Sequence, residues 1–452
     1  MKLPLEGIRI LDVTMVFAGP IAVKILAELG AEVIKVESHY RMDMPCRKLC
    51  YPENVPGNEP WNRGGYFHYF NTNKLGITLA LHKPEGIDVF KRLVKISDVV
   101  IENFSPRVMK NFGLDYDVLR ACKPDIIMAS ISGFGQTGPY RDRAAYAYVV
   151  EATSGLTSIS GRAGSPTISG TGYADWVMGM YAAGAVLCAL QQRRKTGKGQ
   201  FIEVAGLEGI LFLIGEAVME FTMNGRVREP EGNHQQNMGP CGCYKCAGKE
   251  QWVAITISSD EEWRRFCDAI GNPPWVRNRK FSDGISRMEN QAELDGLVEG
   301  WTVTNDRDAI VNTLAGAGVC AAPVVNAKEI LLDRELKDRG CFQMIDHPQA
   351  GRRPMLKQLA AKFNSGWVGP ERPAPLLGQH NRRVFEDYLG MSEEQINKLE
   401  ARDVIGTAPP KEHQVVEEHG LNIELFERYG AIAKREPDFI EQLQKVWPIK
   451  KR

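Results

Sequence analysis

The chain begins with a strand pattern, a helix pattern and a second strand pattern in close succession. GIRILDVT (7–14) is a short apolar run, MVFAGPIAVKILAELG (15–30) is a loop feeding a helix with proline early in its first turn, and AEVIKVE (31–37) is a second apolar run. Two strands joined through a helix of this length pair in parallel. Further strand patterns, separated by helix patterns, are FNTNKLGITLAL (70–81), DVVIENF (98–104) and DIIMASISGFG (125–135). The sequence therefore predicts an α/β fold with a doubly wound sheet.

Polar side chains lie at the ends of these predicted strands. Asn71, Asn73 and Lys74 precede one strand, and Asn103 with Phe104 ends another. Open parallel sheets bind ligands beyond the carboxyl ends of their strands, so these residues are candidate ligand contacts. Each could equally be a turn residue or a solvated charge. The first turn carries no GxGxxG, so the dinucleotide fingerprint is absent.

One carboxylate stands out in the middle of the chain. Asp175 lies between a small-residue lead-in and an apolar run that continues to Leu190 without another charge. Asp is a favoured helix N-cap, which is the ordinary interpretation of this position. The alternative is a nucleophile, because an ionised carboxylate at the edge of a buried element can attack an activated acyl group.

Composition excludes some partners. Lys plus Arg and Asp plus Glu both number 56, so no overall charge favours nucleic acid or an acidic membrane. The N-terminus lacks the apolar core of a secretory signal, and the longest charge-free apolar stretch, Trp176 to Leu190, is shorter than the roughly 20 residues that span a bilayer. We expect a cytoplasmic protein that binds neither nucleic acid nor membrane.

The ten cysteines do not predict a disulfide scaffold or a metal centre. Two local groups occur, Cys46 with Cys50 and the set Cys241, Cys243 and Cys246. Their spacing is irregular, and His234 is the one evident histidine partner, whereas structural zinc takes four ligands, usually as two spaced pairs. We expect no metal.

Nine ordered motifs carry a family resemblance. They are LDVTMVFAGP, GAEVIKVE, NTNK, ENFSP, SGFGQTGPYRDRAAY, YADWVMG, RRKTGKGQFIEVA, CGCYKC and PLLGQH. In this order they are similar to the class III CoA-transferases, which include the formyl-CoA and carnitine types. The match runs from about Leu5 to Leu399, and the segment from Glu400 to Arg452 lies outside the family's usual length.

The resemblance implies a large nucleotide-binding-type domain made from both chain ends, a smaller inserted α+β domain and an interlocked homodimer. We expect the first part of the large domain at 1–225, a linker at 226–239, the inserted domain at 240–325, the second part of the large domain at 326–400 and an extension at 401–452. The linker assignment rests on its polar, glycine-containing sequence. Spaced apolar residues in the extension predict one or two amphipathic helices that pack on the partner chain, or a solvated tail.

The resemblance also implies the chemistry. Asp175 falls on the aspartate that carries the acyl group while coenzyme A moves from an acyl-CoA donor to a free carboxylic acid. Coenzyme A thioesters are substrates, and no tightly bound cofactor is expected. The coenzyme contacts of the family fall on Val16, Ala18, Lys74, Asn103 and Phe104, with Arg107 near a basic position that is Asn111 here; Ser38 replaces another basic residue. Candidate oxyanion donors are the turn at 241–243 and the segment 133–138.

Two alternatives stay open. The resemblance extends to 2-methylacyl-CoA racemases, which also have an aspartate here but need a second base, and Tyr146 with Ala147 occupies that place. Neutral tyrosine, with a pKa of about 10, is a poor general base, so the transferase is favoured. A non-catalytic CoA-binding subunit would bind without turnover. For the acceptor, Met15, Phe17, Tyr140 and Tyr146 favour a medium-sized, partly apolar acid.

Overall fold

The structure is a computed structural model that describes residues 3–162, 164–167, 170–235, 238–364, 368–411, 420–429, 431–432 and 435–449. The chain divides into two compact units. Unit 1 comprises 1–156, 169–223 and 334–452, and unit 2 comprises 157–168 and 224–333. The boundaries expected at 225, 239, 325 and 400 stay predictions, and 236–237 of the linker and 412–419 of the extension lie outside the described residues.

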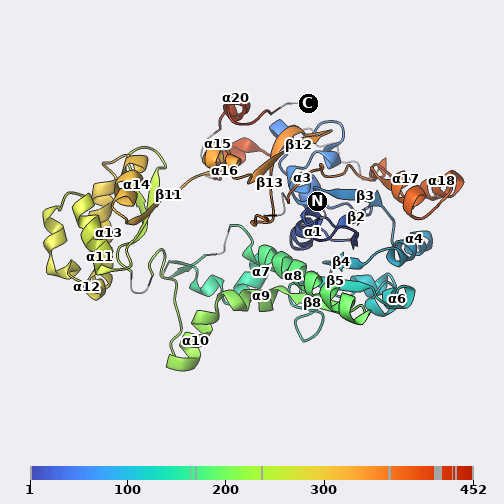
Figure 1. Ribbon diagram of the computed structural model, residues 1–452, viewed down its shortest axis with the longest axis horizontal. Coiled ribbons are helices and arrows are strands. Elements are labelled where there is room, and N and C mark those ends of the chain that lie inside the picture. The colour runs from blue at the N-terminus through green and yellow to red at the C-terminus, as the bar shows by residue number, and fades with distance from the viewer. Residues whose placement is uncertain are drawn as a thin grey trace. The chain divides into compact units, whose positions relative to one another are not determined.

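Unit 1 is built on a parallel six-stranded sheet with the order β3-β2-β1-β4-β5-β8 (Figure 1). The strands are β1 (Arg9–Asp12), β2 (Glu32–Glu37), β3 (Lys74–Thr78), β4 (Val99–Glu102), β5 (Ile127–Ser132) and β8 (Phe201–Ala205). The chain leaves β1 in one direction along the sheet and returns to pair β4 on its other side. This reversal confirms the doubly wound α/β prediction and creates a crevice beyond the carboxyl ends of β1 and β4.

Two apolar cores lie on the two faces of this sheet, because successive strand residues point to opposite sides. Ile10 and Val33 belong to the core beneath α1 (Ala18–Glu28) and α8 (Tyr173–Thr196), whereas Leu11 and Ile34 belong to the core beneath α4 (Pro84–Lys95) and α6 (Tyr116–Cys122). Other unit 1 helices are α2 (Met44–Arg47), α3 (Gly65–Phe70), α5 (Val108–Asn111), α7 (Ala147–Thr153), α9 (Gly206–Leu213), α10 (Gly215–Asn224), α17 (Asn381–Arg383) and α18 (Glu393–Ala401).

Helix α8 is a core helix of unit 1. By length and composition it is the one described helix that could cross a membrane, but half of its apolar window is buried. It packs along α1, where an added Cβ at Gly179 would meet the Ile21 side chain at 2.5 Å. The glycine thus permits the close approach of the two helices.

The segment after α8 corrects one expectation. The largely apolar sequence of residues 203–225 predicts a helix throughout, but Phe201–Ala205 is the edge strand β8 and the helix begins at Gly206. The hydrogen-bonded pairing of this segment with β5 overrides the helical pattern of residues 203–205. The apolar residues Phe201, Ile202 and Val204 suit a strand.

Unit 2 has its own core. Strands β9 (Cys241–Lys245), β10 (Trp252–Thr256) and β11 (Cys320–Pro323) form an antiparallel sheet in the order β11-β10-β9. Its helices are α11 (Asp260–Ala269), α12 (Gly284–Glu289), α13 (Gln291–Thr302), α14 (Arg307–Gly316) and α15 (Ala327–Leu332), and β6 (Gly161–Arg162) pairs with β7 (Ser165–Pro166).

The C-terminal extension packs on its own chain. After α16 (Arg334–Asp338), the strands β12 (Phe342–His347) and β13 (Gly351–Leu356) form an antiparallel ribbon. Ile440 in α20 (Phe439–Gln444) and Trp447 pack against Phe342 of β12, and Lys337 donates to the Val446 carbonyl at 2.6 Å. The helices expected in the extension are present as α19 (Ile423–Arg428) and α20, and α20 covers β12; packing of the extension on a partner chain stays a prediction.

Candidate active site

Asp175 is the third residue of α8 and is not its N-cap. The N-cap is Gly172, at φ 64°, and it has no side chain with which to cap the helix. A left-handed conformation favours glycine at that position. Among the described residues, no hydrogen bond or ion pair holds the Asp175 carboxylate. The capping interpretation therefore does not fit this aspartate, and its oxygens stay available.

Burial and a neighbouring acid raise the pKa of the Asp175 carboxyl. Burial, followed by the nearby Glu151 carboxylate, raises the pKa of the Asp175 carboxyl to about 6. Glu151 lies on α7, is almost fully buried, and accepts a hydrogen bond from the Ala174 N–H at 3.3 Å. Asp175 is thus ionised at neutral pH and more basic than an ordinary aspartate, which suits a nucleophile.

A cavity of about 1190 Å³ opens beside Asp175, entirely within unit 1. One part of its lining is aromatic, comprising Phe17, Tyr66, Tyr69, Phe70, Tyr148, Tyr173 and Trp176. Another part carries Arg339, Cys341, Lys357 and Lys362 from the segments flanking the β12–β13 ribbon. The aromatic rings pack on one another, with Phe17 and Phe70 centroids 5.1 Å apart. The cavity combines a carboxylate, an apolar wall and nearby cations.

A buried ion pair in α1 fixes one wall of this cavity. Lys24 and Glu28 are both fully buried with 3.9 Å between Nζ and Oε1. The Lys24 ammonium donates to the Leu356 carbonyl at 3.0 Å, and the Glu28 carboxylate accepts from the Gln358 and Leu359 N–H groups. Burial lowers the pKa of Lys24 to about 8. Leu356, Gln358 and Leu359 line the cavity, so α1 holds a segment more than three hundred residues away in sequence.

Val16 and Ala18 lie at the crevice beyond β1. Ala18 is the first residue of α1, and Val16 adopts φ 65°, which is unusual for a β-branched residue. Phe17 lies between them and lines the Asp175 cavity. The predicted coenzyme turn and the predicted nucleophile therefore border one connected region of unit 1.

Asn103 joins this turn from β4. Its Oδ1 accepts from the Met15 N–H at 2.7 Å and its Nδ2 donates to the Met15 carbonyl at 2.8 Å. Phe104 follows it, half-buried, and its N–H donates to Glu102 at 2.7 Å. The structure thus uses the Asn103 amide to fasten the turn, which the sequence did not predict.

Lys74 lies beneath the same crevice. Its Nζ is fully buried and donates to Asp12 Oδ2 at 2.8 Å and Asn71 Oδ1 at 3.0 Å. Burial lowers the pKa of Lys74 to about 8. Lys74 is therefore a fixed, paired cation, and its expected contact with the coenzyme stays a prediction.

Arg107 is the one predicted coenzyme residue with a largely exposed side chain. It follows Phe104 in the chain, is 66% exposed, and pairs with Asp142 at 3.4 Å. An exposed ion pair of this kind holds a guanidinium weakly, so the group is free to move.

The remaining candidates are dispersed. In the 133–138 segment, the Gln136 N–H donates to Glu203 at 2.7 Å. Residues 241–243 belong to unit 2. Tyr146, at the predicted racemase position, is 73% exposed and precedes α7, whereas Ala147 is buried. Of the residues expected near the acceptor, Phe17 lines the Asp175 cavity; Met15, Tyr140 and Tyr146 are not among its lining residues.

Sequence reasoning missed two groups at this site. Glu151 is a lone acid in the apolar run AYVVEAT, and that isolation was the available signal. The aromatic residues of α3 carried no signal, because aromatic residues at helical spacing more often form core.

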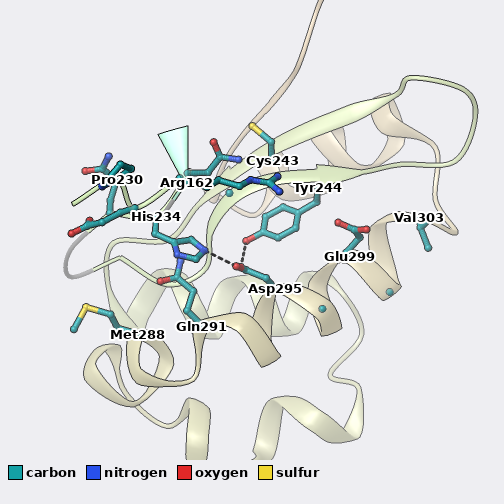
Figure 2. Close-up of a pocket in the computed structure, with 17 residues that line it drawn as sticks. Arg162, Pro230, His234, Cys243, Tyr244, Met288, Gln291, Asp295, Glu299 and Val303 are labelled. Atoms are coloured by element: carbon teal, nitrogen blue, oxygen red, sulfur yellow. Dashed lines mark hydrogen bonds and ion pairs between the residues drawn. The ribbon is translucent and has the colours of Figure 1, made fainter. Parts of the chain in front are cut away.

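Unit 2 holds a separate cavity of about 920 Å³ in which a carboxylate joins two ring side chains (Figure 2). Asp295 accepts from the Tyr244 hydroxyl at 2.7 Å and lies 2.9 Å from His234 Nε2. His234 therefore turns to Asp295 and not to Cys243 (Figure 2). Within the described ranges, no three His, Cys, Asp or Glu side chains gather as metal ligands would.

Comparisons with known proteins identify the family. The chain matches the sequence model of CoA-transferase family III over residues 5–381. It is 34% identical over 409 residues to a succinyl-CoA–D-citramalate CoA-transferase of Chloroflexus aurantiacus, covering 89% of this chain and 98% of that protein. It is 31% identical over 432 residues to a formyl-CoA:oxalate CoA-transferase of Bradyrhizobium sp., covering 91% and 99%. A solved CAIB/BAIF family protein from Brucella suis superposes with a TM-score of 0.78 at 29% identity, covering 86% of this chain and all of that one. The chain therefore belongs to CoA-transferase family III, and the protein is an enzyme of that family.

Proposed function

We propose that the protein moves coenzyme A from an acyl-CoA donor to a free carboxylic acid through covalent intermediates on Asp175. The observation that carries the proposal is the Asp175 carboxylate, which is unpaired among the described residues, has its pKa raised to about 6 and borders a cavity that suits an organic substrate. An ionised carboxylate there is both available and basic enough to attack a thioester.

The reaction follows from carboxylate chemistry. Asp175 Oδ attacks the thioester carbonyl, the C–S bond breaks, and a mixed anhydride and a CoA thiolate form. The thiolate attacks the aspartyl carbonyl, which releases the donor acid and leaves an aspartyl-CoA thioester. The acceptor carboxylate then attacks that thioester, the C–S bond breaks, and a second mixed anhydride and the CoA thiolate form. The thiolate attacks the acceptor carbonyl of this anhydride, which yields the new acyl-CoA and frees the Asp175 carboxylate. Each step conserves the activated acyl bond, so no external energy source is needed.

The crevice beyond β1 supports coenzyme binding. The first turn of α1 carries no side-chain cap and no acidic residue, so its N–H groups favour an anion. Buried Lys35 and Lys74 lie beneath the turn, and exposed Arg107 lies beyond β4. Phosphates of coenzyme A suit this set of donors, and Phe104 offers a ring face to the adenine.

The cavity lining supports a partly apolar acceptor. An acid with a hydrocarbon or ring body would contact Phe17, Phe70 and Trp176, and its carboxylate would be attracted to Arg339 or Lys362. The relatives act on citramalate and oxalate, as their names state, so small hydroxy and dicarboxylic acids are the competing class.

An interlocked homodimer in the cytoplasm completes the proposal. Exposed apolar side chains on α8 and the two helices that follow support a covering partner, because monomers rarely leave so many together. Met180 is 56% exposed, Phe212 76% and Met223 74%, and α10 buries none of its residues. Light scattering tests this part: we expect twice the chain mass, and a monomer at working concentration would contradict it.

The racemase is less well supported. Tyr146 and Ala147 occupy the position of its second base, and neither serves as a base at neutral pH.

An acid screen tests the proposed activity. Purified protein is mixed with succinyl-CoA or acetyl-CoA and a panel of carboxylic acids, and new acyl-CoA products are measured by chromatography. We expect transfer, with partly apolar acids preferred. Exclusive use of formate and oxalate would refute the preference. No transfer, together with deuterium entry at the α-carbon of a branched acyl-CoA in heavy water, would favour the racemase.

A further inference from the structure

The turn between β1 and α1 is hydrogen-bonded by side chains from a short helix, and the proposed reaction assigns that helix no role. Helix α2, residues Met44–Arg47, follows β2 and comes within hydrogen-bond distance of Val16 from two sides. The Asp43 carboxylate accepts from the Val16 N–H at 3.0 Å, and the Cys46 thiol donates to the Val16 carbonyl at 3.1 Å. Both polar groups of one peptide residue are therefore satisfied by side chains three positions apart.

Asp43 does not serve as an ordinary helix cap. It occupies the N-cap position of α2, where Asp normally accepts from the first-turn N–H groups, yet no side-chain cap bond is present. Its carboxylate is fully buried and points instead to Val16. A buried carboxylate directed at a distant turn is better explained by what it holds there.

The backbone conformation of Val16 needs support from its surroundings. Its φ of 65° lies in the left-handed region, which is strained for a β-branched side chain and persists only where the surroundings impose it. Asn103 fixes the preceding residue by bonding both the N–H and the carbonyl of Met15. Phe17, the next residue, lines the Asp175 cavity. The conformation of Val16 thus sets the direction in which Phe17 enters the cavity and α1 begins.

Helix α2, which carries Cys46 and follows Asp43, is fixed to the central sheet. Arg47, the last residue of α2, donates to both carboxylate oxygens of Glu37 on β2, at 3.0 and 2.6 Å, and both side chains are buried. A bidentate pair fixes position and angle together. Asp43 and Cys46 are therefore presented from a rigid base.

We propose that Asp43 is a positioning residue for acyl-CoA binding, which holds Val16 in the left-handed conformation that presents the β1–α1 turn to the coenzyme. This inference rests on the proposed function, since the turn must contact coenzyme A. Asp43 acts through Val16 and need not touch the substrate.

Titration calorimetry with free coenzyme A tests the role without an acceptor acid. Asp43→Ala leaves the Val16 N–H unpaired, so we expect the Kd for coenzyme A and the KM for succinyl-CoA to rise about ten-fold, while kcat changes little. Asp43→Asn keeps an oxygen acceptor at the same place and should stay close to the wild type. Hydrogen exchange at the Val16 amide should accelerate in Asp43→Ala and not in Asp43→Asn.

Asp98→Ala is the matched control. Asp98 also accepts a backbone N–H, that of Arg9 at 2.8 Å, but at the opposite end of β1. Its removal should lower stability without changing the Kd. Should Asp43→Ala fail to fold, Cys46→Ala loosens the other side of the same peptide and should raise the Kd by a smaller factor.

The outcomes separate the two proposals. The positioning role is overturned if the wild type binds coenzyme A and folded Asp43→Ala binds it with the same Kd. If Asp43→Ala does not fold, an unchanged Kd in Cys46→Ala overturns the role instead. Both results leave the proposed function intact. A wild type that binds no coenzyme A overturns the proposed function and the inference with it.

Discussion

Two helix starts in unit 1 are built in opposite ways. Before α1, side chains bind the peptide groups of Thr14, Met15 and Val16. Before α8 the chain turns through Gly172, and side chains bind the Ala174 N–H and the Thr171 carbonyl but, among the described residues, not the Asp175 carboxylate. The two helices pack along each other, so both starts belong to the same region. The turn before α1 is fixed by side-chain hydrogen bonds, whereas the start of α8 carries the unpaired carboxylate of Asp175. The difference matches a surface that must be preorganised for binding and a group that must stay free to react.

The two starts also differ in their charges. Asp12 beneath the first turn is buried, yet Lys35 and Lys74 keep its pKa below the ordinary value. Asp175 has the Glu151 carboxylate beside it, and its pKa is raised to about 6. Paired charges stabilise a fixed structure, whereas an unpaired buried carboxylate lowers stability and gains basicity.

The largest expected effect is at the free carboxylate. Asp175→Ala removes the proposed nucleophile, so we expect transfer to fall by about 10⁴-fold or more while the Kd for coenzyme A stays near the wild-type value. Steady-state transfer and calorimetry measure the two quantities. Retained turnover within ten-fold of the wild type would exclude Asp175 as the nucleophile.

Next is the charge pair beneath the tied turn. Lys74→Met keeps the shape but leaves Asp12 buried with Lys35 at 3.9 Å as its cation, so we expect the free energy of unfolding to fall by about 3 kcal/mol. Asp12→Asn combined with Lys74→Met should recover part of that loss. Denaturant unfolding gives the values. If the single variant also leaves the KM for acyl-CoA unchanged, Lys74 has no part in coenzyme binding.

A smaller effect is a gain in stability, which we expect when the Asp175 charge is removed. Because the pKa of Asp175 is about 6 in the native state against 3.8 for the model carboxyl, the native state binds more protons between these values. The wild-type free energy of unfolding therefore falls, through this residue, as pH rises from about 4 to 6. Asp175→Asn lacks that fall and should be more stable than the wild type at pH 8, by at most about 3 kcal/mol, and no more stable below pH 4. Equal stability at both pH values would show that the carboxylate is not strained.

The smallest expected effect is electrostatic. The acid limb of kcat/KM should lie near pH 6 in the wild type, because protonated Asp175 cannot attack. Glu151→Gln keeps an oxygen for the Ala174 N–H and removes the charge, so the limb should move to lower pH by a fraction of a unit. Glu32→Gln, at the surface pair with Arg9, is the control and should leave the limb in place. An unmoved limb in Glu151→Gln would assign the raised pKa to burial alone.

The sequence predicted strands β1 to β5 and placed Asp175 at the start of a helix, because strand patterns and an apolar run after a turn are local signals. It did not predict that Asn103 and Asp43 fasten the first turn, since those bonds join residues far apart in the chain. It did not predict that Lys74 is buried and paired with Asp12, because burial depends on the whole sheet. Residues 203–205 of the edge strand β8 were assigned to a helix for the same reason: the pairing of β8 with β5 is tertiary. Tertiary contacts thus decide the details of the site that local patterns leave open.

Intact-protein mass spectrometry tests the central claim most directly. Wild type and Asp175→Ala are mixed with succinyl-CoA, and the mass is measured before and after digestion. We predict a covalent acyl or coenzyme A adduct on the wild type that maps to the peptide containing Asp175, and no adduct on the variant. An equal adduct on both proteins, or one that maps to another residue, would contradict the account.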